Sequence, residues 1–262
     1  MSALVLSPNI EFLFADASPD FNERVSIAAD AGVRAFEFWG WRDKDVAGLE
    51  RVLRANNVRV TAMVIDPIVS MVCEPDQFVL AIRETAAVAG RLGASTIIVA
   101  SGARDDTASA AEQCDRAVAA LCDALPFAEA NGVALAIEPV NTFDHPIVYV
   151  SRLHHALSIV DAVESAALGI VVDFYHASRM NEIVADAIGD RVGLIRHMQL
   201  AGLPQRDEPS VGNTPYLDTV RAFRSAGYDG PIGLEYRPQL ASEASWASVR
   251  EFLSEELEAT AR

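Results

Sequence analysis

Two hydrophobic patterns alternate along almost the whole chain. Short, mostly apolar runs are typical of strands, and longer segments with apolar residues three and four apart are typical of amphipathic helices. We expect strands over residues 9–14, 33–39, 58–65, 95–100, 133–138, 168–173, 192–200 and 231–236. We expect helices over residues 21–32, 43–57, 76–93, 106–131, 151–163, 178–188, 214–227 and 245–257.

This succession of one strand and one helix indicates a parallel sheet, because each connection must cross back over the sheet. Eight such units in a chain of 262 residues are typical of a (β/α)₈ TIM barrel. An open, doubly wound sheet is the alternative that the pattern allows. The sequence has no linker, low-complexity tract or change of composition, so we expect a single domain over residues 1–262.

Composition limits the possible partners. The formal net charge is −16, and so acidic a surface repels phosphate backbones, which makes nucleic acid an unfavourable partner. A small anionic substrate is still compatible with this charge, because one arginine in the binding site can outweigh the average negative potential of the surface. No apolar run reaches the roughly 18 residues of a membrane helix, and the first residues lack the features of a signal peptide. We therefore expect no membrane association, a cytoplasmic location and three reduced, mostly buried cysteines.

Some chemistries lack the residues that they need. Lys44 is the only lysine and does not end a strand, so a Schiff-base aldolase is disfavoured. The phosphate-binding patterns G-x-x-x-x-G-K-[ST] and G-x-G-x-x-G do not occur, so the sequence shows no cradle for a nucleotide cofactor.

The last four predicted strands each end in a side chain that carries oxygen. These residues are Glu138, Asp173, Gln199 and Glu235, and each is separated from the next by about one strand–helix unit. In a barrel, the carboxyl ends of the strands form one rim, where active sites lie. Strand alternation also places small residues below both glutamates, which leaves room near the barrel axis.

Three carboxylates on one rim repel one another, and a divalent cation relieves that repulsion. A set of two glutamates, one aspartate and one glutamine amide offers only oxygen, which suits Mg²⁺ or Mn²⁺ better than zinc. We therefore predict one metal ion held by these four residues. The alternative is that they are solvated polar residues at strand ends.

Four segments carry a family resemblance. I-E-P-V-N-T-F-D-H-P, V-V-D-F-Y-H-A, H-M-Q-L-A-G-L-P-Q-R-D-E-P and G-L-E-Y-R-P resemble the hydroxypyruvate isomerase family. That family belongs to the xylose-isomerase-like TIM barrels, which include ketose 3-epimerases. The resemblance spans the whole chain and is sharpest from Glu138 onward. It implies that Glu138, Asp173, Gln199 and Glu235 are metal ligands, and that Glu138 and Glu235 carry protons.

The chemistry that the resemblance implies is an isomerisation through an enediolate. The metal polarises the carbonyl and the adjacent hydroxyl of the substrate, one glutamate removes the proton, and the other handles its return. The implied reaction converts hydroxypyruvate to tartronate semialdehyde. A 2-oxo-tetronate isomerase or a ketose 3-epimerase is the alternative within the class. The resemblance also makes a homodimer or homotetramer plausible.

Five further residues receive expected roles beside this centre. The resemblance implies that His176 contacts a substrate oxygen; the alternative is that it only forms a hydrogen bond at the start of a helix. The resemblance also implies that Arg206 binds the substrate; the alternative is that it is an ordinary surface charge. Glu208 is expected to orient Arg206 or a ligand, and His197 to lie one layer below the metal, because it shares strand parity with Gln199. Asn141 can touch substrate or simply shape its turn.

The segment W-G-W-R, residues 39–42, departs from the family pattern. Trp39 and Trp41 can stack on a sugar face or close the pocket against water, and Arg42 can add an anion contact. Packing of a loop or of an oligomer interface explains the two tryptophans equally well.

Two other functions are alternatives to the isomerase. A nuclease like endonuclease IV shares the broad fold, but its zinc cluster needs histidines at early strand ends, and this chain has none there. A sugar-binding barrel without catalysis is the non-enzyme alternative.

Overall fold

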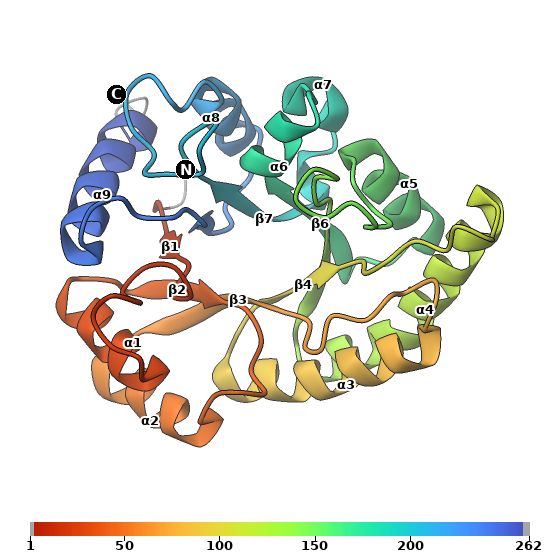
Figure 1. The fold of residues 1–262 in the computed structure, drawn as a ribbon, viewed down its shortest axis with the longest axis horizontal. Helices are drawn as coiled ribbons and strands as arrows, with labels where there is room; N and C mark the ends of the chain where they lie inside the picture. Colours follow the sequence, from red (N-terminus) through yellow and green to blue (C-terminus); the bar gives the residue numbers. More distant parts are fainter. Residues whose placement is uncertain (1–2, 259–262) are drawn as a thin grey trace.

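A computed structural model describes residues 3–258 and shows eight parallel strands surrounded by helices (Figure 1). The strands pair in the order β1-β8-β7-β6-β5-β4-β3-β2, and every pairing in this order is parallel. The predicted (β/α)₈ barrel is therefore confirmed, and the open doubly wound sheet is not what forms. The single-domain assignment over residues 1–262 stays a prediction.

The strands are short and almost completely buried. Their bounds are β1 Leu6–Pro8, β2 Ala35–Phe38, β3 Arg59–Val64, β4 Thr96–Ala100, β5 Ala134–Glu138, β6 Leu168–Asp173, β7 Ile195–Leu200 and β8 Ile232–Leu234. Burial on both faces is expected of a parallel barrel, whose outside packs on helices and whose inside packs on itself.

The helices of the described residues form the outer layer. Their bounds are α1 Phe21–Asp30, α2 Val46–Asn56, α3 Pro75–Leu92, α4 Ala110–Ala130, α5 Leu153–Val163, α6 Phe174–Arg179, α7 Val184–Ile188, α8 Leu217–Ser225 and α9 Ser242–Glu258, with a 3₁₀ turn at Val192–Leu194. Local sequence sets where they start: Ser109 and Glu112 form a capping box at α4. Among the described residues, no helix combines the length and the apolarity needed to cross a bilayer.

The seam between β1 and β2 is closed by Asn9 and Glu37. These two residues form an isolated parallel bridge, and the backbone N–H of Ile10 donates to the Glu37 oxygen at 3.0 Å. Between β1 and β2 the barrel therefore closes through a single bridge between two polar residues, and not through a continuous ladder of β-sheet hydrogen bonds.

The predicted first strand over residues 9–14 is wrong, because β1 covers Leu6–Pro8 and the chain then turns. The N–H of Leu13 donates to the Asn9 oxygen, and Phe14 has a φ of 63°. Ile10, Leu13 and Phe14 are all buried, at a spacing of three and four residues. That spacing belongs to a helical turn, which the apolar run had concealed.

The predicted helix over residues 178–188 is also wrong in its bounds. It is replaced by α6 and α7, and α6 begins directly after β6. The cause is Asp173, whose Oδ1 accepts from the N–H of Tyr175 at 2.7 Å and of His176 at 3.2 Å, which caps the new helix at once.

The cysteines are free, as expected, but the expectation that they are mostly buried is wrong, because Cys73 and Cys122 are exposed.

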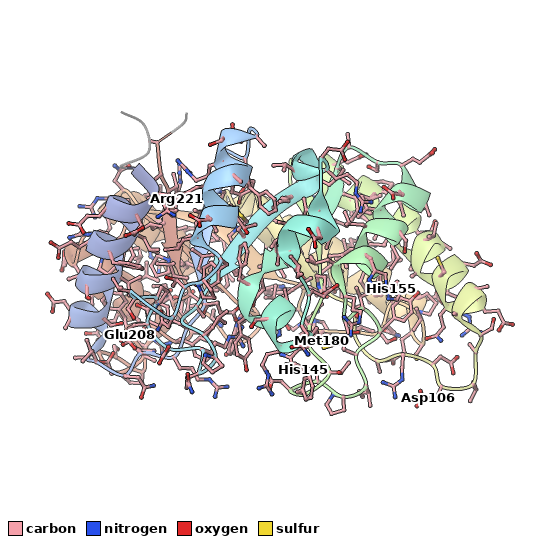
Figure 2. The ribbon with its side chains drawn as sticks, turned by 90° about the horizontal axis from the view of Figure 1, so that it is seen from above. Asp106, His145, His155, Met180, Glu208 and Arg221 are labelled. Atoms are coloured by element: carbon pink, nitrogen blue, oxygen red, sulfur yellow. The ribbon has the colours of Figure 1, made fainter. Side chains whose placement is uncertain are left out.

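The loops that follow the strands gather at one end of the barrel. In Figure 2, Asp106, His145 and Glu208, which lie on loops after β4, β5 and β7, line one edge of the molecule. Arg221, in α8, lies toward the opposite edge. The loop edge is the carboxyl end of the strands, where the site residues predicted from the sequence are placed.

Candidate active site

Three carboxylates are buried at the carboxyl ends of β5, β6 and β8, on one rim of the barrel. Glu138 ends β5, Asp173 ends β6, and Glu235 directly follows β8. Burial raises the pKa of Glu138 well above its usual value, and repulsion by Glu235 and Asp173 raises it further. Burial also raises the pKa of Glu235 to about 7, although the guanidinium of Arg206 opposes that rise. The site therefore disfavours full ionisation of its own carboxyl groups.

Arg206 lies between two of these carboxylates. Its Nη2 is 3.1 Å from Oε2 of Glu235 and 3.4 Å from Oδ2 of Asp173. The guanidinium also lies over the ring of Tyr175, 4.7 Å from its centroid. Arg206 has a φ of 61°, and its backbone oxygen accepts from the N–H of Arg237 at 2.7 Å. The loop after β7 thus delivers a positive charge into the acidic site.

His176 is a buried imidazole whose tautomer is set by its neighbours. Its Nδ1 accepts from the backbone N–H of Asn141 at 3.2 Å and faces the Asn141 side-chain amide at 2.7 Å. Its Nε2 faces Oδ2 of Asp173 at 3.6 Å and Oε1 of Glu138 at 3.8 Å. Burial lowers the pKa of His176 to about 4. The ring is therefore neutral near pH 7, with its proton on Nε2, toward the carboxylates.

Gln199 is buried in β7, beside Asp173 in the sheet register. Its Nε2 donates to Oε1 of Glu37 at 2.9 Å. Its Oε1 is buried and has no hydrogen-bond partner among the described residues. A buried acceptor without a partner is costly, so this oxygen is available to a ligand.

The two tryptophans of the 39–42 segment have different surroundings. The indole N–H of Trp39 donates to Oε1 of Glu235 at 2.9 Å, while the residue as a whole remains 38% exposed. The indole N–H of Trp41 donates instead to Thr85 in α3 at 3.2 Å, and Arg42 lies over the Trp41 ring. Trp39 therefore touches the site, whereas Trp41 and Arg42 pack toward α3.

Two other predicted residues, Asn141 and Glu208, hold neighbouring groups in place. Asn141 engages both ends of its amide, because its Oδ1 accepts from Phe143 and Asp144 and its Nδ2 faces His176. Glu208 does not contact Arg206 through any described hydrogen bond or ion pair. Its carboxylate accepts instead from the backbone N–H groups of residues 239 and 240, which ties the loop after β7 to the loop after β8.

His197 is fully buried in β7 and bonds Glu37, with Nε2 2.5 Å from Oε2. Glu37 itself is a residue that the sequence analysis missed. It contacts His197 and Gln199 together, and it is 1% exposed. The available signal was a lone charge inside the apolar run A-F-E-F, since an unpaired glutamate is almost never fully buried. Phe12 was also missed, and it packs edge-on against Trp39, with ring centroids 5.0 Å apart.

The donor atoms at this site can be grouped in two ways. Ligand atoms of Glu138, Asp173 and His176 all lie within 4.8 Å of one another, a compact set among the described residues. The set predicted from the sequence replaces His176 by the amide oxygen of Gln199 and adds Glu235. Both sets share Glu138 and Asp173.

The fold and the site together define a parallel β/α barrel with a buried acidic centre at the carboxyl ends of its strands. The family profile described as the xylose isomerase-like TIM barrel matches residues 25–256. The chain belongs to this family, and the resemblance stated from the sequence is confirmed.

Individual relatives cover different shares of the chain. The chain is 38% identical over 128 residues to a 2-oxo-tetronate isomerase of Cupriavidus necator, and that match spans about half of each protein, 48%. It is 28% identical over 254 residues to the hydroxypyruvate isomerase of Escherichia coli, across 92% of this chain and 96% of that one.

Among solved structures, an AP endonuclease, family 2, from Brucella melitensis superposes with a TM-score of 0.87. The alignment covers 95% of this chain and 99% of that chain, at 23% identity. At this identity the likeness shows the fold alone.

Proposed function

We propose that this chain is an isomerase of a small hydroxy-carbonyl compound and that it uses one divalent metal ion, Mg²⁺ or Mn²⁺. One observation carries the proposal: Glu138 and Glu235 are both buried, both have raised pKa values, and they lie at the ends of two different strands, β5 and β8, on one rim. Glu235, whose pKa is raised to about 7, can both accept and return a proton near neutral pH. The names of the relatives, hydroxypyruvate isomerase and 2-oxo-tetronate isomerase, support the same class.

The residues present fit a hard divalent cation. Glu138, Asp173 and Glu235 supply carboxylates whose mutual repulsion a cation would relieve, and Gln199 supplies a buried oxygen without a partner. We propose these four as the ligands, as the sequence predicted.

His176 suits a different role. A histidine that binds metal through Nε2 must carry its proton on Nδ1, but Nδ1 already accepts the backbone N–H of Asn141. We therefore propose that His176 donates its Nε2–H to a substrate oxygen.

The metal, when bound, polarises the carbonyl and the adjacent hydroxyl of the substrate and so acidifies the intervening C–H. One of Glu138 and Glu235 removes that proton, and the other returns a proton to the neighbouring carbon or oxygen of the enediolate. Arg206 grips a substrate carboxylate or steadies the developing negative charge. Trp39 keeps one oxygen of Glu235 engaged, which orients the other.

Hydroxypyruvate, converted to tartronate semialdehyde, is the substrate we propose first. Arg206 supports it, because a guanidinium inside an acidic site suits a substrate that carries a carboxylate. A 2-oxo-tetronate is the second candidate, favoured by the higher identity of the relative that bears this name. Neutral ketoses, the substrates of 3-epimerases, are the third. A homodimer or homotetramer, a cytoplasmic location and the absence of nucleic acid or membrane partners stay predictions.

The proposal is tested by proton exchange. Hydroxy-carbonyl compounds of roughly three to six carbons, with and without a carboxylate, are incubated in D₂O with the protein and Mg²⁺ or Mn²⁺, and loss of C–H signals is followed by NMR. We expect exchange at the carbon beside the carbonyl of carboxylated compounds, and little exchange with Glu138→Gln. Metal binding without exchange on any compound would overturn the isomerase in favour of the sugar-binding barrel.

A further inference from the structure

Glu37 is a carboxylate sealed inside the barrel, away from any role assigned above. It lies in β2, is 1% exposed, and forms the isolated bridge that closes the seam with Asn9. Burying a carboxylate is expensive unless hydrogen bonds replace its water. Its partners therefore indicate what it is for.

Three nitrogen atoms surround this carboxylate. Nε2 of Gln199 donates to Oε1 at 2.9 Å, and Nδ2 of Asn9 donates to the same oxygen at 3.4 Å. Nε2 of His197 lies 2.5 Å from Oε2. His197 and Gln199 are two residues apart in β7, so they share one face of that strand and both reach the barrel interior.

The space for this cluster depends on Gly233 in β8. A Cβ at this position would lie 2.4 Å from Oε2 of Glu37 and 2.7 Å from Nε2 of His197. Any side chain there would displace one of the two. Because Gly233 has no side chain, Glu37 in β2 can form hydrogen bonds with His197 and Gln199 in β7 across the barrel.

The cluster distinguishes the two ends of the Gln199 amide. The NH₂ end of the amide faces Glu37, because its Nε2 donates to Oε1 of that carboxyl group at 2.9 Å. The C=O end then has to point elsewhere, and this Oε1 is the buried acceptor without a partner among the described residues. Without Glu37 the amide could rotate and present its NH₂ group, which cannot bind a cation.

We propose that Glu37 is a positioning residue that holds Gln199 with its amide oxygen turned toward the metal site. The inference rests on the proposed function, because it assumes that Gln199 is a ligand. Outer partners of this kind fix the orientation of a ligand and are worth about 10- to 100-fold in metal affinity. A neutral amide needs this help more than a carboxylate, since only one of its two ends binds metal.

The test measures the Kd for Mn²⁺ of the full-length protein by titration with electron paramagnetic resonance, and a melting temperature for each variant. Glu37→Met, which is similar in length and has no acceptor, is expected to weaken Mn²⁺ binding about 10- to 100-fold. Glu37→Gln keeps one acceptor oxygen and is expected to retain most of the affinity. This partial rescue would not follow from a role in stability alone.

One control variant shares the buried setting. Ser7→Ala breaks the buried hydroxyl pair with Thr61 elsewhere in the barrel. It is expected to lower the melting temperature and to leave the Mn²⁺ affinity nearly unchanged.

The outcomes separate the inference from the function beneath it. If wild-type protein and Glu37→Met bind Mn²⁺ equally, the positioning role is overturned and the metal site stands. If the wild-type protein binds no divalent metal, both are overturned. A crystal structure of the wild-type protein with Mn²⁺ is a second test, and it does not depend on whether a variant folds. One end of the Gln199 amide is expected to stay within hydrogen-bond distance of Glu37 while the other meets the ion, and an amide turned away from Glu37 would refute the inference.

Discussion

The indole N–H of Trp39 donates to Oε1 of Glu235 at 2.9 Å, between residues 196 positions apart in the sequence. This bond joins the loop after β2 to the end of β8, on opposite sides of the seam where the barrel closes. It also lowers the pKa of Glu235, against the larger effect of burial. Trp39 therefore acts on the protonation of a proposed catalytic group and not only on the shape of the pocket mouth.

Replacing Trp39 by phenylalanine removes this hydrogen bond and keeps an aromatic ring beside Phe12. The bond favours the ionised carboxylate, so its loss raises the pKa of Glu235. We expect the acidic limb of the pH profile of kcat to move up by about 0.5 to 1 pH unit. Trp41→Phe is the matched control, because that indole donates to Thr85. An equal shift in both variants would contradict the role assigned to Trp39.

Arg206 decides whether a carboxylate on the substrate matters. Arg206→Ala is expected to lower kcat/KM for hydroxypyruvate by about 10- to 100-fold more than for a neutral ketose, because a hydrogen bond between charged groups is lost. Arg206→Lys keeps the charge without the planar fork and should fall between the two. Steady-state kinetics on both substrate classes measure the difference. An equal loss on both would rule out hydroxypyruvate and 2-oxo-tetronates in favour of neutral ketoses.

His176 separates the two possible ligand sets. As a hydrogen-bond donor to substrate, its replacement by alanine is expected to lower kcat by about 100- to 1,000-fold. The Kd for Mn²⁺ should stay within a few-fold of the wild-type value, whereas Gln199→Ala should weaken Mn²⁺ binding by at least about 10-fold. Isothermal titration with Mn²⁺ makes the comparison. If His176→Ala loses the metal and Gln199→Ala keeps it, the compact set of Glu138, Asp173 and His176 is the metal site.

The raised pKa values predict how the metal-free protein responds to pH. Glu138 and Glu235 hold protons more tightly when folded than when unfolded, so their contribution to stability is present at low pH. It is lost as pH rises from about 4.5 through the folded-state pKa of each group, which is about 7 for Glu235. In chelator, the free energy of unfolding of the wild-type protein relative to Glu138→Gln should fall between pH 5 and pH 7.5. Urea titrations at the two pH values measure this.

Two further effects are separated within the same experiment. The lowered pKa of His176 works in the opposite direction, because the unfolded chain binds its proton more tightly between pH 4 and 6.5, so stability rises with pH there. Both proteins carry His176, so this effect largely cancels in the difference. Added Mn²⁺ should restore stability to the wild-type protein at pH 7.5 by mass action. Parallel pH curves for the two proteins would mean that Glu138 does not hold its proton as described.

The local pattern of apolar residues was sufficient to predict the architecture. The alternation of strands and helices depends on the spacing of apolar residues a few positions apart, and that spacing predicted the barrel and its carboxyl-end rim. The exceptions have local causes as well. The helical spacing of Ile10, Leu13 and Phe14 was hidden in an apolar run, and Asp173 started α6 earlier than its neighbours indicated.

Four residues of the candidate site could be named from the sequence, because each lies at the end of an apolar run that predicts a strand. They are Glu138, Asp173, Gln199 and Glu235. Only the tertiary structure decided what faces them. Arg206 bridges two carboxylates, Trp39 rather than Trp41 reaches Glu235, and Glu208 holds a loop instead of Arg206. Of these contacts, the one between Trp39 and Glu235 joins strands β2 and β8, which come together only when the sheet closes on itself. Glu37 and Gln199, 162 positions apart, become neighbours through that closure alone, and no periodicity along the chain records it.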